Sequence, residues 1–230
     1  MKKKAPLLAV FLLLGLVVFC LAQNSEKKAV SLSSLKVGES INLPPPRLKG
    51  EMSLEEALAK RRSIRSFSST PLTLEQISQL LWAGQGITEP QRGFRTAPSA
   101  GATYPYELYV VTNEGVFHYL PLGHKLEKVK EGNIRAELTA AAMGQASVGN
   151  AGAVFILLAI PERTTSRYGE RGKMYVYIEA GHIAQNILLQ AVALKLGSVP
   201  VGAFDPNRVK QMLGLMEGEV VYLIPVGHPR

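Results

Sequence analysis

The chain has 230 residues, of which 47% are hydrophobic and 19% are charged, a balance that is typical of a globular domain and excludes a disordered or fibrous protein. The formal net charge is +8, but Lys2, Lys3 and Lys4 at the N-terminus supply three of these charges. The remaining excess is spread thinly, without the basic stripes and stacking aromatics of nucleic-acid-binding surfaces, so we expect no nucleic-acid partner.

The first 22 residues have the pattern of an export signal. A positive segment ends at Lys4, and Ala5–Ala22 is uncharged and rich in Leu, Val and Phe. Cleavage after Ala22 would give an exported, periplasmic or extracytoplasmic protein; a run of this length is also close to the shortest spanning helix, so a retained membrane anchor stays open. Cys20 is the only cysteine, which leaves no intramolecular disulfide and no cysteine metal cluster. Phe19 immediately before it disfavours lipidation.

Composition then divides the rest of the chain into two parts. Residues 23–50 contain scattered polar side chains and the stiff run Pro44–Pro46, which indicates an extended linker or a wrapping arm. Residues 51–230 are predicted to form one domain. The expected organisation is therefore a signal peptide or membrane anchor (1–22), a proline-rich linker or arm (23–50) and a single domain (51–230).

Within that domain, helical and strand patterns are interspersed. Two capping boxes, each a hydroxyl residue followed three positions later by Glu or Gln, predict short helices. The unbroken apolar run of residues 153–159 predicts a strand buried on both faces. Because no βαβ period recurs, we expect an α+β fold with a mostly antiparallel sheet, flanked by helices and built around a long central helix. The predicted helices begin at Ser53 and Thr73 and cover 134–143, 175–196 and 205–213; the predicted strands are 108–111, 116–119, 153–159 and 220–226.

Three guanidinium groups and a hydroxyl follow the first predicted helix within five positions, at Arg61, Arg62, Ser63 and Arg65. Guanidinium forks bind phosphate oxygens through charge-assisted bidentate hydrogen bonds, so the cluster predicts a phosphate site. The alternative is a solvated basic helix end that complements the helix dipole. Two further segments, Thr96–Pro105 and Gly197–Asp205, consist largely of small residues that let a flat ligand approach the backbone, although each alone also suits an ordinary loop.

Taken together and in order, these segments resemble the FMN-dependent nitroreductase family, especially its SagB-type dehydrogenase and azoline-oxidase branch. The resemblance runs from about Ser53 to the C-terminus. Its motifs are R-R-S-I-R-S-F (61–67), A-P-S-A-G-A-T-Y-P-Y-E-L-Y-V-V (97–111), E-A-G-H-I-A-Q-N (179–186), L-G-S-V-P-V-G-A-F-D (196–205) and I-P-V-G-H-P (224–229).

This resemblance implies a homodimer with two FMN sites at the subunit interface, each built from both chains. By position, Arg61 and Ser63 would hold the phosphate, and Arg65 would lie near the N1/O2 edge of the flavin ring. The partner subunit would contribute Pro98–Gly101, and the backbone at Gly202 and Ala203 would face the N5/O4 edge. The expected cofactor-binding residues are Arg61, Arg62, Ser63, Arg65, Pro98, Ser99, Ala100, Gly101, Gln145, Pro200, Val201, Gly202 and Ala203.

Because a flavin would carry the chemistry, neither a catalytic triad nor a metal is required. Four polar residues interrupt the long apolar helix at Glu179, His182, Gln185 and Asn186. His182 is a candidate proton donor, against the alternative of a dimer-interface or core histidine. Three tyrosines are weak candidates for a substrate pocket, since tyrosines also serve packing; they are Tyr104, Tyr168 and Tyr175. Tyr104 is also, beside His182, a weak catalytic candidate.

Two departures from the family pattern matter. Many relatives carry further basic residues beyond the last strand that help to bind the phosphate. Here the alternatives are that Arg230 takes this role or that phosphate affinity rests wholly on the cluster from Arg61 to Arg65. The run Gly101–Thr103 resembles the end of a covalent-flavinylation motif, but the acidic residue of that motif is absent, so we expect non-covalent FMN.

The expected function is two-electron, ping-pong transfer through FMN to a small organic acceptor such as a nitro compound or a quinone. NAD(P)H is the donor that most relatives use, but it is not expected outside the cytoplasm, so the leader favours a quinol, thiol or protein donor, or oxidase activity. One alternative is a SagB-like dehydrogenase or oxidase of a peptide or small molecule. Another is a membrane-tethered, non-catalytic binding module.

Overall fold

The computed structural model describes residues 31–230, so the predicted leader lies outside the described residues. Leu32–Arg230 forms one compact unit. This unit begins before the boundary predicted at residue 51, because the segment ahead of it packs into the domain. None of the helices within residues 31–230 is long and apolar enough to cross a membrane.

The arm is tied to the domain by both backbone and side chains. Strand β1 (Ser40–Asn42) pairs antiparallel with β6 (Lys125–Lys130), and Leu32, Leu35 and Leu43 are buried in the core. After the proline run, the Arg47 N–H donates to Gln79 Oε1 at 2.8 Å. Of the two predicted alternatives for this segment, residues 32–50 therefore form a wrapping arm rather than an extended linker.

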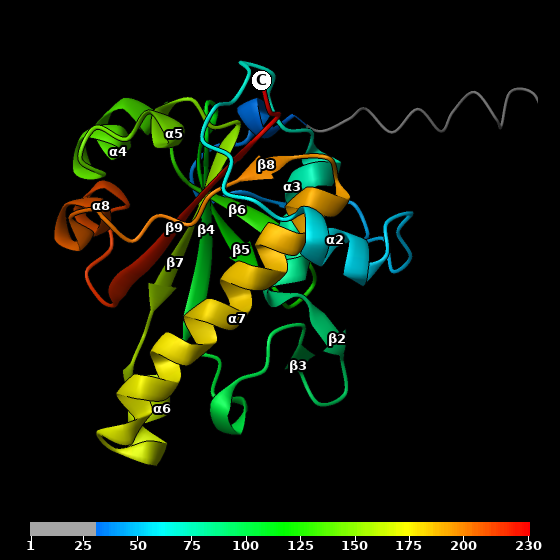
Figure 1. The fold of residues 1–230 in the computed structure, drawn as a ribbon. Helices are drawn as coiled ribbons and strands as arrows, with labels where there is room; N and C mark the ends of the chain where they lie inside the picture. Colours follow the sequence, from blue (N-terminus) through cyan, green and yellow to red (C-terminus); the bar gives the residue numbers. More distant parts are fainter. Residues whose placement is uncertain (1–30) are drawn as a thin grey trace, which may run out of the picture. The chain divides into compact units, whose positions relative to one another are not determined.

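A seven-stranded antiparallel sheet forms the centre of the domain, as the sequence predicted, and Figure 1 shows helices packed against it. The hairpin strands β4 (Tyr106–Thr112) and β5 (Gly115–Leu120) pair antiparallel, with Leu108 opposite Tyr119. A separate two-stranded sheet is formed by β2 (Ile87–Glu89) and β3 (Phe94–Arg95). The order of the large sheet is β1, β6, β5 (Gly115–Leu120), β4 (Tyr106–Thr112), β7 (Ala153–Ala159), β9 (Glu219–Gly227) and β8 (Gly197–Ser198).

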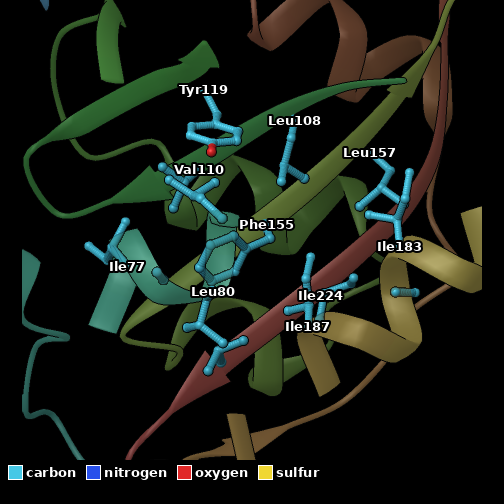
Figure 2. Packing of buried hydrophobic residues seen from close by; sticks show 14 of the residues in the cluster. Ile77, Leu80, Leu108, Val110, Tyr119, Phe155, Leu157, Ile183, Ile187 and Ile224 are labelled. Carbon is cyan, nitrogen blue, oxygen red and sulfur yellow. The ribbon is translucent and has the colours of Figure 1, made fainter. Parts of the chain in front are cut away.

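Strand β7 is buried on both faces, which confirms the prediction from its apolar run. Phe155 and Leu157 join a core cluster with residues of the helices α3 (Leu74–Gln85) and α7 (Arg171–Ala193), and Figure 2 shows Leu80, Ile183 and Phe155 packed in it. The alternate residues of β7 join a second cluster on the other face with residues of α4 (Arg135–Ala141), α5 (Ala146–Gly149) and α8 (Pro206–Met212). The period of two along the strand thus divides one apolar segment between two helical layers.

Helix starts follow the predicted caps. The Glu56 N–H donates to Ser53 Oγ at 3.1 Å, and Thr73 with Gln76 forms a full capping box. Figure 1 shows α7 as the longest helix, lying across the sheet. The helices are η1 (Leu32–Ser34), α2 (Leu54–Lys60), α3 (Leu74–Gln85), η2 (Ala100–Ala102), α4 (Arg135–Ala141), α5 (Ala146–Gly149), α6 (Glu162–Tyr168), α7 (Arg171–Ala193) and α8 (Pro206–Met212).

Some elements differ from the prediction. Helix α7 begins at Arg171 rather than residue 175, and the unpredicted α6 precedes it with a break at Gly169, whose φ of 55° suits glycine. Strands β1 and β6 were also missed. Strand β1 is a three-residue edge strand, and β6 lies between it and β5. Both have few apolar residues, so their position depends on pairing rather than on their own periodicity.

Candidate functional site

The arginine segment that follows α2 lies against the end of the large sheet. The Ile64 N–H donates to Ser198 O at 3.0 Å, and Ser63 forms a parallel bridge with Ser198 of β8. On its other side, the Ser68 N–H donates to His228 O at 2.8 Å. The backbone of residues 63–68 is therefore fixed between two late segments of the chain.

The arginines of this segment have different partners. Arg62 Nη1 donates to Ala59 O at 3.1 Å and to Arg61 O at 2.7 Å, so its guanidinium satisfies carbonyls at the end of α2. Within residues 31–230, the side chains of Arg61, Ser63 and Arg65 make no ion pair or hydrogen bond. Two cations and a hydroxyl are thus available to an anion, while Arg62 has the helix-end role that the sequence left open.

The loop after β8 presents open backbone next to this segment. Val199 and Val201 are buried, and the Val201 N–H donates to Leu223 O at 2.8 Å, whereas Gly202 and Ala203 are exposed. A Cβ at Gly202 would meet no atom within 4 Å. Gln145 Nε2 donates to Ala203 O at 2.8 Å and so holds the loop in place.

The donors and the open backbone of these residues suit a flat ligand that carries a phosphate. Arg61, Ser63 and Arg65 supply uncommitted donors suited to a phosphate, and the backbone around Gly202 leaves room for a ring. Ser198 is 2% exposed and its Oγ has no hydrogen-bond partner among the described residues. Such an orphaned hydroxyl is costly unless a ligand or water completes it. These features fit FMN.

Close packing at Gly197 holds the arginine segment in place. A Cβ there would lie 2.8 Å from Ile64 Cβ and Cγ2. We expect Gly197→Ala to lower the free energy of unfolding by about 1–3 kcal/mol through overpacking. Urea unfolding would measure this loss, with Gly50→Ala as control because a Cβ at Gly50 meets nothing within 4 Å. Equal stability of the two variants would contradict the packing argument.

The segment Pro98–Tyr104, which we call the strained loop, has three residues in the left-handed region: Gly101 (φ 60°), Ala102 (φ 54°) and Tyr104 (φ 45°). Such conformations cost roughly 1–3 kcal/mol each for non-glycine residues and persist only when surrounding contacts impose them. Helix α6 supplies such contacts, since Arg167 Nη1 donates to Gly101 O at 3.3 Å. Strain of this kind concentrates at functional sites.

A buried polar cluster lies behind the strained loop. Glu179 of α7 is 2% exposed, and burial raises its pKa to about 7 although the Ser99 hydroxyl, the Arg95 charge and the Gln85 amide oppose the shift. Arg95 Nη1 donates to Gln85 Oε1 at 2.8 Å. Burial also lowers the pKa of Arg95. Across residues 31–230, no group of three or more His, Cys, Asp or Glu could hold a metal ion.

The catalytic candidates from the sequence have protein partners here. His182 Nδ1 donates to Pro98 O at 3.3 Å, and the Tyr104 hydroxyl accepts from the Arg95 N–H at 3.2 Å. Tyr168 and Tyr175 pack edge to face, with ring centroids 5.2 Å apart. His182 thus contacts the strained loop through Nδ1, and Tyr104 ties the end of that loop to β3; the catalytic role of either residue stays a prediction.

The predicted cofactor residues fall into two groups. In the first group, Ser63, which lies between Arg61 and Arg65 in the chain, forms a bridge with Ser198 of β8, and Gln145 contacts Ala203 in the loop after β8. The second group, Pro98–Gly101, contacts α6 and the middle of α7. In Figure 1 the segment that follows β3 lies toward the α6 end of α7, away from β8. A single chain therefore holds two separate halves of the predicted site.

Two hollows of the single chain lie outside both halves. A groove of about 650 Å³ is bounded by the proline run, α3 and the end of α7. A smaller hollow of about 220 Å³ is lined by Phe67, Arg135 and Arg230, among others. The backbone N–H of Arg230 donates to Ser66 O at 3.2 Å, so this residue lies beside the arginine segment.

Comparison with known proteins identifies the family. The model of the nitroreductase family matches residues 58–228. The chain belongs to the nitroreductase family. A Methanocaldococcus jannaschii protein named as a nitroreductase is 43% identical over 197 residues, which cover 83% of this chain and 98% of that protein. This membership makes the chain an oxidoreductase.

Two further relatives of this nitroreductase-family chain are informative. A crystal structure from Ralstonia eutropha, also named as a nitroreductase, has a TM-score of 0.76 and 28% identity and covers 85% of this chain and 92% of its own. The Microcin B17-processing protein McbC of Escherichia coli is 26% identical over 164 residues, 66% of this chain. The chain spans only 60% of the length of McbC. The predicted nitroreductase-like fold is confirmed.

Sequence reasoning missed several polar residues around this nitroreductase-family site. Ser198, Gln85 and Arg95 gave no signal, because burial and partners are visible only after folding. Glu179 did give a signal in the sequence, because it is a carboxylate that interrupts an apolar helix. Its position near the strained loop became visible only in the tertiary structure.

Proposed function

We propose that this protein binds FMN non-covalently and transfers two electrons in ping-pong fashion from a donor to a small organic acceptor such as a nitro compound or a quinone. The observation that carries the proposal is that the segment containing Arg61, Ser63 and Arg65 pairs with Ser198 of β8, the strand that leads into the open backbone of Gly202 and Ala203. The Ile64–Ser198 hydrogen bond fixes the two segments relative to each other. The family membership agrees with this assignment.

Each residue would have a defined part in binding. Arg61 and Ser63 would bind the phosphate, since neither side chain has a hydrogen-bond or ion-pair partner within residues 31–230 and Ser63 adjoins β8. Arg65 would place a fixed cation near the ring, where it stabilises negative charge. Gln145 would keep the loop at Ala203 in position through its 2.8 Å hydrogen bond. Bound FMN would supply the two-electron chemistry, while the chain positions it and leaves a ring face open.

We further propose a homodimer in which Pro98–Gly101 of the partner subunit completes each site. Helix α7 has exposed apolar residues at helical spacing, namely Met174, Tyr177 and Ile178, and α2 adds exposed Leu54 and Leu58. Large exposed apolar patches mark interaction sites. A second copy covering this surface would bring the missing half-site to the arginine segment.

A visible absorption spectrum tests the cofactor assignment. We expect purified protein, or protein incubated with FMN and desalted, to retain flavin absorption that acid precipitation releases into solution, because the binding is non-covalent. Anaerobic addition of NADH would then show whether NAD(P)H is an electron donor. Protein that stays colourless with FMN would favour the non-catalytic binding module instead.

We propose export as well, on the basis of the N-terminal pattern, which lies outside the described residues. The electron donor would then be a quinol, a thiol or a protein rather than NAD(P)H. The alternative is that the protein acts as an oxidase, with oxygen as the electron acceptor. Fractionation of cells with N-terminal sequencing tests this, and we expect a mature chain that begins at Gln23 outside the cytoplasm or a retained membrane anchor. Native protein in the cytosol with rapid NADH turnover would contradict export.

The second candidate is a SagB-like dehydrogenase that forms a C=N or C=C bond in a peptide or small molecule. The match to McbC, a microcin-processing protein by name, favours it. Mass spectrometry of azoline-containing peptides incubated with the flavin-loaded protein would distinguish the two candidates. A loss of two hydrogens from the peptide supports the dehydrogenase, whereas turnover of nitro compounds or quinones alone supports the first candidate.

A further inference from the structure

Helix α6 contacts the strained loop through several side chains. Besides Arg167, described above, Arg163 Nη1 donates to Tyr104 O at 3.2 Å. The hydroxyl of Thr164, a residue that is 1% exposed, lies 2.7 Å from the Thr103 hydroxyl. Arg163 and Arg167 are four positions apart and so share one face of the helix. Helix α6 therefore holds both the middle and the end of the loop.

Tyr104 has an unfavourable backbone conformation. Its φ of 45° lies in a region where a bulky residue is an outlier. Pro105 follows it, and a proline drives the residue before it toward extended conformations. Without contacts that impose this conformation, the backbone of Tyr104 would relax. The carbonyl that Arg163 binds is the one that such a relaxation would move.

The sheet sets the position of the Arg163 guanidinium. Arg163 Nη2 pairs with Glu107 Oε1 of β4 at 2.6 Å, and His118 Nε2 of β5 donates to Glu107 Oε2 at 2.8 Å. The His118 ring in turn stacks on Tyr109, with ring centroids 4.6 Å apart. Because a guanidinium is planar and rigid, pairing of one nitrogen with Glu107 directs the other nitrogen toward Tyr104. Strands β4 and β5 thus reach the loop through one arginine.

A contribution to overall stability does not explain this arrangement. The side chains of Glu107 and Arg163 are 22% and 41% exposed, and ion pairs in contact with solvent stabilise a fold only slightly. The pair instead supports a loop whose left-handed residues oppose folding. That loop contains Pro98–Gly101, the segment that the proposed FMN site takes from the partner subunit. Its conformation is therefore what the arginine serves.

We propose that Arg163 is a positioning residue that holds the strained loop in the conformation that contacts the flavin of the partner subunit, and that Glu107 acts through Arg163. This inference rests on the proposed FMN function. Without Arg163 the loop would adopt relaxed conformations. The FMN affinity would then fall in proportion to the fraction of molecules that keep the strained one.

Titration of the full protein with FMN, followed by quenching of flavin fluorescence, tests the proposal. We expect Arg163→Ala to weaken FMN binding about tenfold, which corresponds to a strained loop in about one molecule in ten. Glu107→Gln should weaken binding about threefold, because an amide binds a guanidinium less strongly than a carboxylate does. It should add nothing to Arg163→Ala, since the two residues act as one unit.

Arg92→Ala is the matched control for the loss of an arginine. Arg92 also pairs with a carboxylate, that of Glu89 at 3.7 Å, and its side chain makes no hydrogen bond to the loop among the described residues. We expect this variant to keep the wild-type FMN affinity.

A glycine substitution separates positioning from a general loss of stability. Ala102 is exposed and has a φ of 54°, so Ala102→Gly removes only an exposed methyl group and lowers the cost of the left-handed conformation. Combined with Arg163→Ala, it should recover FMN affinity about threefold. Loss of general stability alone would not be recovered in this way.

Amide hydrogen exchange of the ligand-free protein gives a readout that does not depend on FMN. The Ala102 N–H donates to Ser99 O at 3.1 Å and the Thr103 N–H to Ala100 O at 3.3 Å, so both amides report on the loop conformation. We expect these amides to exchange faster in Arg163→Ala, while exchange in the buried strand β7 stays unchanged.

Each outcome decides the question. Unchanged FMN affinity or unchanged loop exchange in Arg163→Ala overturns the positioning role while FMN binding by the wild type stands. A loss of affinity that Ala102→Gly does not recover overturns it as well. Wild-type protein that binds no FMN overturns the proposed function, and the positioning role with it.

A second variant covers the case in which Arg163→Ala does not fold. Arg163→Lys keeps the charge but lacks the planar fork that bonds to Glu107 and Tyr104 together. We expect it to weaken FMN binding about fivefold and to be partly recovered by Ala102→Gly. Wild-type affinity in Arg163→Lys would overturn the proposal.

Discussion

Replacement of both Arg61 and Arg65 by alanine should weaken FMN binding by about a hundredfold or more. Hydrogen bonds to charged groups contribute about 1.5–3 kcal/mol each, and 1.4 kcal/mol corresponds to a tenfold change in affinity. Neither side chain pairs with another described residue, so removing it leaves no protein group unsatisfied. The loss should therefore appear in ligand binding rather than in stability. Titration of FMN into the apoprotein, followed by fluorescence, measures the effect.

Two comparisons make this prediction specific. Riboflavin lacks the phosphate, so its affinity for wild-type protein should already be low, and the double substitution should change it far less than it changes FMN affinity. Arg62→Ala should reduce FMN affinity less than either other arginine does, because the Arg62 guanidinium is bonded to Ala59 and Arg61 carbonyls. Equal losses for riboflavin and FMN would show that these arginines do not bind the phosphate.

Glu179→Gln should make the ligand-free protein more stable at alkaline pH, by up to roughly 3 kcal/mol for a shift of pKa from 4.5 to about 7. The folded state binds the proton more tightly than the unfolded state does. The contribution of Glu179 to the wild-type free energy of unfolding is therefore fully present below pH 4.5. It is lost as the pH rises to about 7, because folding must then bury the charged carboxylate. The amide variant avoids this decline.

Urea unfolding of wild type and variant across this pH range measures the difference, without added FMN because a ligand stabilises by mass action. The two curves should coincide near the acidic limit and separate as pH increases. A constant difference at all pH values would show that Glu179 does not titrate between its ordinary pKa and neutrality. A gain in stability together with a loss of FMN affinity would mark Glu179 as a residue kept for function.

Much of the fold could be predicted because local patterns carried enough information. The capping residues Ser53 and Thr73 begin α2 and α3 where expected, and the apolar run that became β7 has the predicted bounds. Strands β1 and β6, at one end of the sheet order, could not be predicted from their own residues, because antiparallel partners rather than periodicity define them. The domain boundary was misplaced for the same reason, since the arm belongs to the sheet through β1.

The sequence by itself determined the residue types at the site, because the order of small-residue loops and arginines is local and carries the family resemblance. Only the tertiary structure decided how each residue is used. The Arg62 guanidinium bonds to carbonyls at the end of α2, whereas Arg61 and Arg65 have no hydrogen-bond or ion-pair partner among residues 31–230. Glu179 is buried near Ser99, which lies some eighty positions earlier in the chain. Hydrogen-bond partners and burial depend on long-range packing, and no spacing along the chain encodes them.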